Sequence, residues 1–268
     1  MKRDVLKRFE TTTALKADAV QFAQSLIGKD IMKLIDTGLS NTKIKKTQQH
    51  SNPFDRPFRL SSLSLYPNDT ICAGSILAQC REACLRHAGR GTFGNVIEGR
   101  QKKTDLFMTD RDRFLDTYTR ELENFQKLCD KDNIQAVHRG NVISDISWEK
   151  YGIPQLFPRM FFYDYTKIAH RLGRTPKNYQ LMFSYSGVPA YQNQVRRALK
   201  TNVPISAVFN GPFPDRFLDR EVIDGDQSDL VNLNAGAVVI GLIAKGPAKR
   251  DHSGFVIHTN KIDVAEVA

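Results

Sequence analysis

Apolar and polar positions along the chain follow two different periods, and the period changes near residue 60. Before that point, Ala19, Phe22 and Leu26 recur at three- and four-residue spacing, which indicates an amphipathic helix. After that point, the apolar residues form short runs that are separated by helical stretches. We therefore expect a helical N-terminal subdomain at 1–59 and an α/β domain at 60–268.

In the second region, short apolar runs alternate with helical stretches, which is the pattern of βα units around a mainly parallel sheet. Strands are expected at 60–66, 134–139, 159–164, 179–184, 203–209, 220–223 and 236–242. Helices are expected at 75–88, 94–107, 111–130, 146–151, 166–172 and 189–200. Roughly six to eight βα units in a domain of this length predict an α/β fold that forms a complete or partial TIM-like (β/α) barrel.

Polar residues follow several of the expected strands. Barrels and open parallel sheets carry their chemistry at the carboxyl ends of the strands, so these residues are expected to share one rim. The acid–base or positioning groups predicted there are Asp145, Asp164, Lys167, Asp226 and Lys245. Loops are polar in most proteins, so the alternative interpretation is that these residues are ordinary loop residues that form no functional site.

Composition changes this picture little, since 41% hydrophobic and 25% charged residues are typical of a globular domain. The net charge does add information: it is +10, and residues 1–59 hold 12 Lys or Arg against 6 Asp or Glu. We expect a basic N-terminal arm, and a surface field that attracts nucleic acid or phosphorylated ligands.

No segment of the sequence suggests a membrane or a secretory route. The apolar stretch at 235–244 is much shorter than the roughly 20 residues that a membrane helix needs. The N-terminus carries charges throughout and lacks an apolar signal core. We therefore expect a cytoplasmic protein whose cysteines are reduced or bound to metal.

Three cysteines are spaced as C-x7-C-x3-C, at Cys72, Cys80 and Cys84. The last two lie four residues apart on the helix expected at 75–88, so their sulfurs would share one face. Three thiolates in a strand–loop–helix segment suit an iron–sulfur cluster such as [4Fe-4S]. Zinc is the alternative metal, although its structural sites favour shorter spacings. Packing of these small residues in the core is the third interpretation.

A glycine-rich turn follows the cysteines. Gly89, Arg90, Gly91 and Gly94 belong to a G-x-G-x-x-G sequence, but this one follows an expected helix instead of a strand, so it is not a dinucleotide fingerprint. A left-handed cap at Gly89 would let backbone N–H groups bind an anion at the start of the next helix. A plain turn between helices is the alternative.

Several segments resemble a known family. They are LSLYPNDTICAGSILAQCREACLRHAGRGTF, then Arg100, Lys103 and Thr104, VHRGNVISDISWE, FFYDYTK, VIDGDQSD and VVIGLIAKGPA. Together they resemble the bacteriophage "gene product 88" type of domain over residues 41–250. The cysteine segment also resembles radical SAM enzymes, whose barrels bind [4Fe-4S] through C-x3-C-x2-C, although the spacing here differs. The resemblance implies a phage origin and a fold more than an activity.

The leading hypothesis is a phage-encoded enzyme with a cysteine-ligated iron–sulfur cluster that acts on a nucleic acid or nucleotide. Cys72, Cys80 and Cys84 would be the ligands, and the glycine-rich turn would hold an anion. One alternative is a nucleic-acid-binding protein without catalysis, in which a cluster or zinc is structural. Another is a phage protein that binds a host protein. The sequence predicts no oligomeric state.

Overall fold

The computed structural model of the chain describes residues 32–37, 42–50, 52–230 and 235–259. It separates into two compact units, Met1–Lys33 and Leu34–Ala268, and the sheet belongs to the second unit. Residues 1–31 lie outside the described residues, and with them lie the helix expected around Phe22 and much of the expected basic arm.

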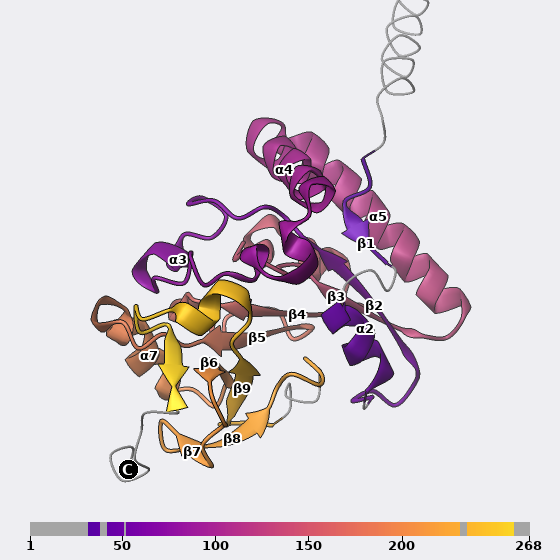
Figure 1. Cartoon of the computed structure of the whole chain (residues 1–268). Helices are drawn as coiled ribbons and strands as arrows, with labels where there is room; N and C mark the ends of the chain where they lie inside the picture. Colours follow the sequence, from indigo (N-terminus) through magenta and orange to yellow (C-terminus); the bar gives the residue numbers. More distant parts are fainter. Residues whose placement is uncertain (1–31, 38–41, 51, 231–234, 260–268) are drawn as a thin grey trace, which may run out of the picture. The chain divides into compact units, whose positions relative to one another are not determined.

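The second unit is built on a ten-stranded sheet in the order β1-β2-β3-β4-β5-β6-β9-β8-β7, with β10 beside β6 (Figure 1). The strands are β1 (Ile35–Asp36), β2 (Phe58–Leu63), β3 (Gln135–Arg139), β4 (Phe161–Thr166), β5 (Tyr179–Ser184), β6 (Ile205–Asn210), β7 (Arg216–Phe217), β8 (Arg220–Asp224), β9 (Val239–Ile243) and β10 (Val256–His258). Pairing is parallel from β2 through β6 to β9 and β8, whereas β1 and β7 add antiparallel edges. Each of the seven expected strands corresponds to one of these.

The predicted α/β class is confirmed, but the complete or partial TIM-like barrel is not, because the sheet is open. Its ends are β1 and β7, and no pairing joins those two strands among the described residues. The parallel strands follow one another in sequence as far as β6, and β9 then lies between β6 and β8. A (β/α) barrel closes only if each new strand is added at the same edge. The structure is therefore a mixed α/β fold around an open sheet.

β10 extends the sheet beside the second half of β6. β5 pairs with β6 at Ile205 and Ser206, whereas β10 pairs with it at Val208, Phe209 and Asn210. The edge of β6 thus passes from one partner to the other near the carboxyl end of β5. A break between two strands at this level leaves room for side chains and loops.

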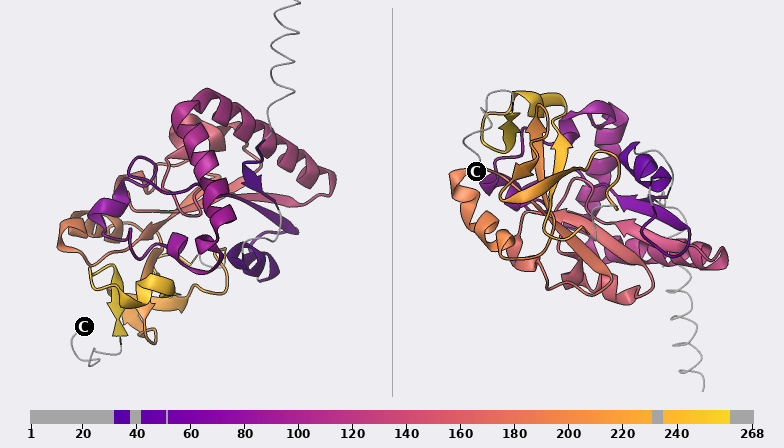
Figure 2. Two further views of the ribbon diagram at one scale, coloured as in Figure 1. Left: turned by 45° about the horizontal axis from the view of Figure 1, so that its top comes forward. Right: turned by 90° about the horizontal axis from the view of Figure 1, so that it is seen from below.

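Helices cover the sheet and fill its connections (Figures 1 and 2). The α-helices are α2 (Thr42–Gln49), α3 (Gly74–Leu77), α4 (Gly94–Thr109), α5 (Arg111–Lys131), α6 (Ile153–Leu156) and α7 (Gln192–Leu199). The 3-10 helices are η1 (Leu85–His87), η2 (Gly89–Thr92), η3 (Trp148–Tyr151), η4 (Ala169–Arg171), η5 (Pro189–Tyr191) and η6 (Gly246–Arg250). No helix in the described part of the chain has the length and apolar character needed to cross a membrane.

α5 illustrates how the sequence pattern produces its element. The Asp110 side chain caps the helix by accepting a hydrogen bond from the Arg113 backbone N–H (3.2 Å). Phe114, Tyr118 and Leu122 recur every four residues and are fully buried. This face packs against β3, and α4 lies alongside α5. The helices expected at 94–107 and 111–130 are thereby confirmed.

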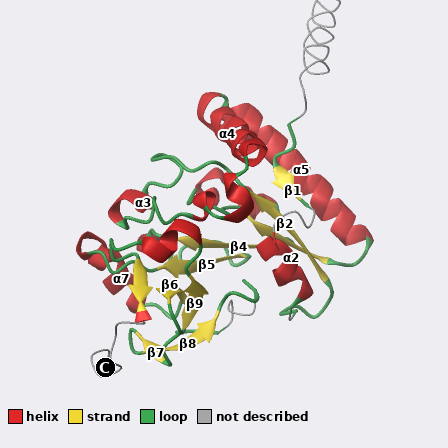
Figure 3. Ribbon diagram, viewed as in Figure 1, coloured by secondary structure: helices red, strands yellow, loops and turns green. Residues whose placement is uncertain are grey.

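The helix expected at 75–88 is wrong. Only one turn of helix forms, α3, and the chain then passes through loop and 3-10 turns (Figure 3). Gln79 adopts a left-handed conformation (φ 50°), which ends the helix. Ile76 and Leu77 are 58% and 42% exposed, so a longer helix would have no apolar face to bury. Cys80 and Cys84 therefore do not share a helix face.

The N-terminal part of the unit is integral to the sheet. α2 packs against β2, and the boundary expected at residue 60 falls within β2. Residues of α2, of β2 to β5 and of β9, together with one residue from the segment between β8 and β9, form one apolar cluster: Ile44, Phe58, Leu60, Val137, Tyr163, Met182, Leu230 and Ile240. We call this side of the sheet the cavity face, and the side that carries α5 the helix face.

Candidate active site

A cavity of about 220 Å³ lies on the cavity face at the carboxyl ends of the parallel strands, beyond the apolar cluster. Its walls come from successive strands, with Arg139 from β3, Tyr165 from β4, Ser184 from β5 and Leu242 from β9. Side chains two positions apart on a strand point to the same face of the sheet. Each wall residue follows a residue of the apolar cluster by two positions, so the cavity and the cluster lie on the same face. Ligand sites of α/β proteins lie at this edge.

Seven of the twelve predicted site residues line this cavity. They are Cys72, Cys80, Cys84, Asp145, Lys167, Asp226 and Lys245. The remaining five do not line it: Gly89, Arg90, Gly91, Gly94 and Asp164. Four of the five residues predicted at the strand ends therefore lie together at one cavity, and the glycine-rich turn does not line it.

The glycine-rich turn forms η2 and the start of α4. Gly89 has the expected left-handed conformation (φ 53°), and Thr92 Oγ1 donates a hydrogen bond to the Gly89 carbonyl (2.9 Å). A Cβ at Gly91 would lie 2.9 Å from the carbonyl oxygens of Leu85 and Arg86, so a close backbone approach requires glycine here. These observations account for Gly89 and Gly91 as turn residues.

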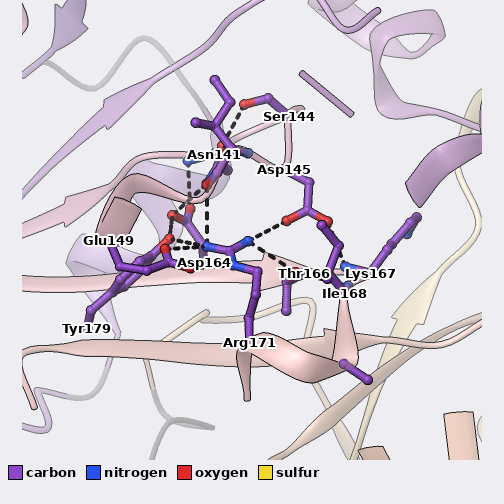
Figure 4. Close-up of polar contacts among 12 residues, drawn as sticks. Asn141, Ser144, Asp145, Glu149, Asp164, Thr166, Lys167, Ile168, Arg171 and Tyr179 are labelled. Carbon is purple, nitrogen blue, oxygen red and sulfur yellow. Dashed lines mark hydrogen bonds and ion pairs between the residues drawn. The ribbon is translucent and has the colours of Figure 1, made fainter. Parts of the chain in front are cut away.

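Asp164 lies on the helix face, within a buried polar network (Figure 4). Its carboxylate accepts hydrogen bonds from the Asn141 backbone N–H (2.6 Å), Asn141 Nδ2 (2.9 Å) and Tyr179 Oη (2.8 Å). Burial raises the pKa of Asp164 to about 7, although these hydrogen bonds act in the opposite direction. Because Asp164 does not reach the cavity, the catalytic role predicted for it is corrected to a structural one.

The same network holds Asp145. Its carboxylate pairs with Arg171 Nη1 (2.7 Å) and accepts a hydrogen bond from the Lys167 backbone N–H (2.8 Å). Arg171 also forms an ion pair with Glu149 (2.8 Å). Both oxygens of Asp145 are thus engaged at the cavity wall, one by the Lys167 backbone and the other by Arg171.

The cysteines lie on the loop between β2 and α4, which is tied to the rest of the unit. The Asp145 backbone N–H donates to the Ile71 carbonyl (2.8 Å), and Ser186 Oγ donates to the Ala78 carbonyl (2.9 Å). A Cβ at Gly74 would lie 2.7 Å from Lys167 Cβ, so glycine lets the loop pack directly onto Lys167. The loop therefore closes one side of the cavity with its three thiols.

Burial raises the pKa of two of these thiols. It raises the pKa of Cys72 to about 12 and also raises that of Cys84. The ionisation of Cys72 further responds to Cys80 and Cys84, so the three sulfurs lie near one another. Among the described residues, no three His, Cys, Asp or Glu side chains converge as the ligands of a single metal ion. Cys129 is buried on α5 and does not line the cavity.

Arg139 is the main charged group of the cavity wall. Its Nη1 pairs with Asp229 Oδ2 (2.7 Å), and its guanidinium lies over the Tyr165 ring at 4.9 Å from the centroid. Tyr163 Oη and Tyr165 Oη donate to the same carboxylate (3.2 and 3.0 Å). Burial opposes the charge of Arg139, but Asp229 and the tyrosines outweigh it and raise its pKa above the ordinary value. Arg139 is thus a permanent cation.

Two lysines complete the charge of the cavity. Lys167 Nζ donates to Ser184 Oγ (2.7 Å) and lies over the Phe255 ring. Lys245 Nζ pairs with Asp226 Oδ1 (2.5 Å), and Asp226 Oδ2 accepts the Ile243 backbone N–H (2.7 Å). The cavity wall therefore combines three thiols, the cations Arg139 and Lys167, and the ion pair between Lys245 and Asp226.

Arg139, Tyr165 and Asp229 also line the cavity, although they are not among the twelve predicted site residues. Arg139 follows Val137 on the same face of β3, so alternation was an available signal for its side. Its pairing with Asp229, 90 residues away, carries no local signal. His138, by contrast, lies on the helix face between Ser61 and Tyr118, and burial lowers its pKa to about 3. It is a satisfied core histidine.

The match to known sequences covers both the sheet and the cavity. A family model described as Gene product 88 matches residues 32–259. The chain belongs to the Gene product 88 family. The likeness to this phage-protein family, predicted from motifs within residues 41–250, is confirmed. All the cavity residues of this Gene product 88 chain lie inside the matched region.

The other comparisons add no relative. No curated protein and no solved structure matches the chain. The predicted likeness to radical SAM enzymes is therefore without support. The family description states no reaction, so the chemistry of the cavity is the guide to the function of this Gene product 88 chain.

Proposed function

We propose that the cavity is the active site of an enzyme in which Cys72, Cys80 and Cys84 hold an iron–sulfur cluster beside a nucleotide or nucleic acid substrate. The observation that carries the proposal is that three thiols from one loop line the same cavity as two buried or half-buried cations, Arg139 and Lys167. A site of this kind has ligands for a thiophilic centre on one wall and groups for a phosphate on another.

The donor set favours a cluster over zinc. Zinc needs its ligands to converge at about 2.0–2.3 Å from one point, and the described His, Cys, Asp and Glu side chains form no such group of three. A cubane cluster offers a separate iron to each thiolate, so the thiols share a cavity without meeting at a point. Cys72, Cys80 and Cys84 meet this weaker requirement.

The other cavity residues would bind and orient the substrate. A bound cluster would supply an electron-transfer or Lewis-acid centre next to the substrate. Lys167 would neutralise a phosphate, with its backbone held by Asp145. Asp226 Oδ1 and Lys245 Nζ lie 2.5 Å apart and would accept and donate a proton at the rim. Water is excluded on one side by the cysteine loop, which packs on Lys167 at Gly74.

The test is metal and sulfide analysis of the full chain, purified without oxygen and without a histidine tag. We expect iron and acid-labile sulfide with broad visible absorption, both lost in Cys72→Ala and Cys84→Ala. Cys129→Ala is the matched control, because it removes a thiol that lies outside the cavity. Circular dichroism of each variant separates loss of the cluster from loss of the fold.

Each alternative result has a defined meaning. Stoichiometric zinc without colour would replace the cluster by a zinc site and remove the argument for redox or Lewis-acid chemistry at iron. A folded wild-type protein without any metal would contradict the proposed centre. Equal metal loss in Cys129→Ala and Cys84→Ala would show that the effect is not specific to the cavity.

A further inference from the structure

One donor of the cavity wall is left without a partner inside the protein. Arg139 is 8% exposed, and its Nε has no hydrogen-bond partner among the described residues. Buried polar groups are almost always hydrogen-bonded, and a guanidinium is a more demanding group than most. Arg139 therefore lines the cavity with a guanidinium whose hydrogen bonds are not all made within the described part of the protein.

The arginine is held as a fixed receptor. Asp229 anchors one end of its guanidinium through Nη1, and the Tyr165 ring lies under it. Asp229 is oriented in turn by Tyr163 and Tyr165, whose hydroxyl groups donate to it. A binding group whose rotamer is locked by neighbours loses little conformational freedom when a ligand arrives.

Lys167 adds a second cationic donor to the same cavity. Its Nζ is hydrogen-bonded to the neutral Ser184 hydroxyl, and in the described part of the chain it forms no ion pair. By contrast, Arg139, Lys245 and Arg171 each pair with a carboxylate. Lys167 is thus the cation of the cavity lining that has a neutral hydroxyl instead of a carboxylate as its partner, so a negative group of a ligand can bind it without breaking an ion pair.

The size of the cavity restricts that ligand. A volume of about 220 Å³ is smaller than the roughly 300–1,000 Å³ of sites for drug-sized molecules. Cys72 and Cys80 enclose it from the loop side. A single terminal group fits such a space better than the continuous backbone of a nucleic acid.

We infer that Arg139 and Lys167 form a recognition subsite for the terminal oxyanion, phosphate or carboxylate, of a small-molecule ligand, with the Arg139 guanidinium and Lys167 Nζ donating to it. The inference rests on the proposed function in that it places this ligand in the same cavity, and it narrows the substrate to a small molecule. The subsite itself requires no metal.

The test is isothermal titration of the anaerobically purified full chain with four probes. Inorganic phosphate and adenosine 5′-monophosphate represent a terminal phosphate, propionate represents a carboxylate, and a deoxythymidine oligomer without terminal phosphates represents a nucleic acid backbone. We expect saturable binding of a phosphate or of the carboxylate, and the stronger of these identifies the source of the oxyanion. Binding of the oligomer alone, or of no probe, overturns the inference.

Variants connect the binding to the two residues. Lys167→Gln keeps a donor near Ser184 but removes the charge, and we expect at least a tenfold loss of affinity. Removing Arg139 alone would strand a buried carboxylate, so the second variant is the pair Arg139→Gln with Asp229→Asn, and we expect a loss of similar size. Arg159→Gln is the matched control, since its side chain is 73% exposed and lies outside the cavity. Unchanged affinity in both cavity variants overturns the inference.

The two proposals fail in different ways. Cys84→Ala should lose the cluster and keep oxyanion binding, whereas Lys167→Gln should keep iron and lose oxyanion binding. A wild-type protein without iron that still binds through Arg139 and Lys167 would leave the subsite intact and refute the cluster. A protein with iron whose affinity ignores both residues would do the reverse.

Discussion

The two faces of the sheet use the same kinds of side chain for different ends. On the helix face, Arg171 forms ion pairs with Asp145 and Glu149, and its Nε, Nη1 and Nη2 atoms all have hydrogen-bond partners. On the cavity face, Arg139 also meets a carboxylate and two tyrosines, yet its Nε has no partner among the described residues. A saturated network holds a fold together, whereas an unsaturated one is available to a ligand.

The largest expected effect is a loss of stability on the helix face, and it tests whether the network there holds the fold together. Arg171→Ala would leave the buried Asp145 carboxylate without its counter-ion, so the free energy of unfolding should fall by about 3–5 kcal/mol. Arg171 and Asp145 side chains are 1% and 4% exposed. Urea denaturation measures the change. The control is Arg159→Ala, whose pair with Asp130 is exposed and should contribute at most about 1 kcal/mol. Equal stability of the two variants would refute the scaffold role.

The second prediction uses the pKa of Asp164. Burial raises it from 3.8 to about 7, so the folded state binds a proton that the unfolded state has already released. The contribution of this group to stability is therefore full below about pH 4 and is lost as the pH rises to about 7. The loss amounts to roughly 4 kcal/mol, because one pKa unit corresponds to about 1.4 kcal/mol.

Comparison with Asp164→Asn isolates this group. The amide does not titrate, so the difference in unfolding free energy between wild type and variant should shift in favour of the variant between pH 4 and pH 8. Urea denaturation at several pH values in this range measures it. A difference that stays constant across the range would mean that Asp164 is ionised throughout and that burial does not govern its charge.

The third prediction concerns the cavity face and the proposed cluster. Burial raises the pKa of Cys72 to about 12, so the metal-free thiol is protonated at neutral pH and must release its proton on coordination. Affinity for iron or for a zinc probe should therefore rise with pH, by up to about tenfold per pH unit for each proton released. Competition with a chelator at pH 6.5, 7.5 and 8.5 measures the slope. A slope of zero would exclude protonated thiols as the ligands.

The smallest expected effect separates the ring of Tyr165 from its hydroxyl. Tyr165→Phe keeps the ring under Arg139 but removes the hydrogen bond to Asp229 (3.0 Å). We expect a loss of about 1 kcal/mol in stability and a few-fold loss of oxyanion affinity. Thermal unfolding with and without phosphate measures both. A larger effect on affinity than that of Lys167→Gln would mean that Asp229, and not the cations, controls the site.

Much of the secondary structure, and the edge where the site lies, could be predicted from the chain alone. Period-two and period-3.6 patterns reflect burial of one face of an element, which is a local property, so the seven expected strands and helix α5 were accessible to sequence reasoning. The rim came from a general rule for parallel strands, and that rule brought Lys167, Asp226 and Lys245 to one cavity.

The remainder depends on contacts between distant parts of the chain. Asp164 and Tyr165 are neighbours in β4, but they lie on opposite faces, and nothing local says which face receives a cavity. The cysteine loop is shaped by contacts such as that between Ala78 and Ser186, 108 residues apart, and this is why the expected helix failed. The sheet is open because β9 pairs with β6 and lies between β6 and β8, and this pairing joins strands that are distant in the sequence. Such non-local contacts leave no periodic trace in the chain, because each partner satisfies its local pattern equally well without the other.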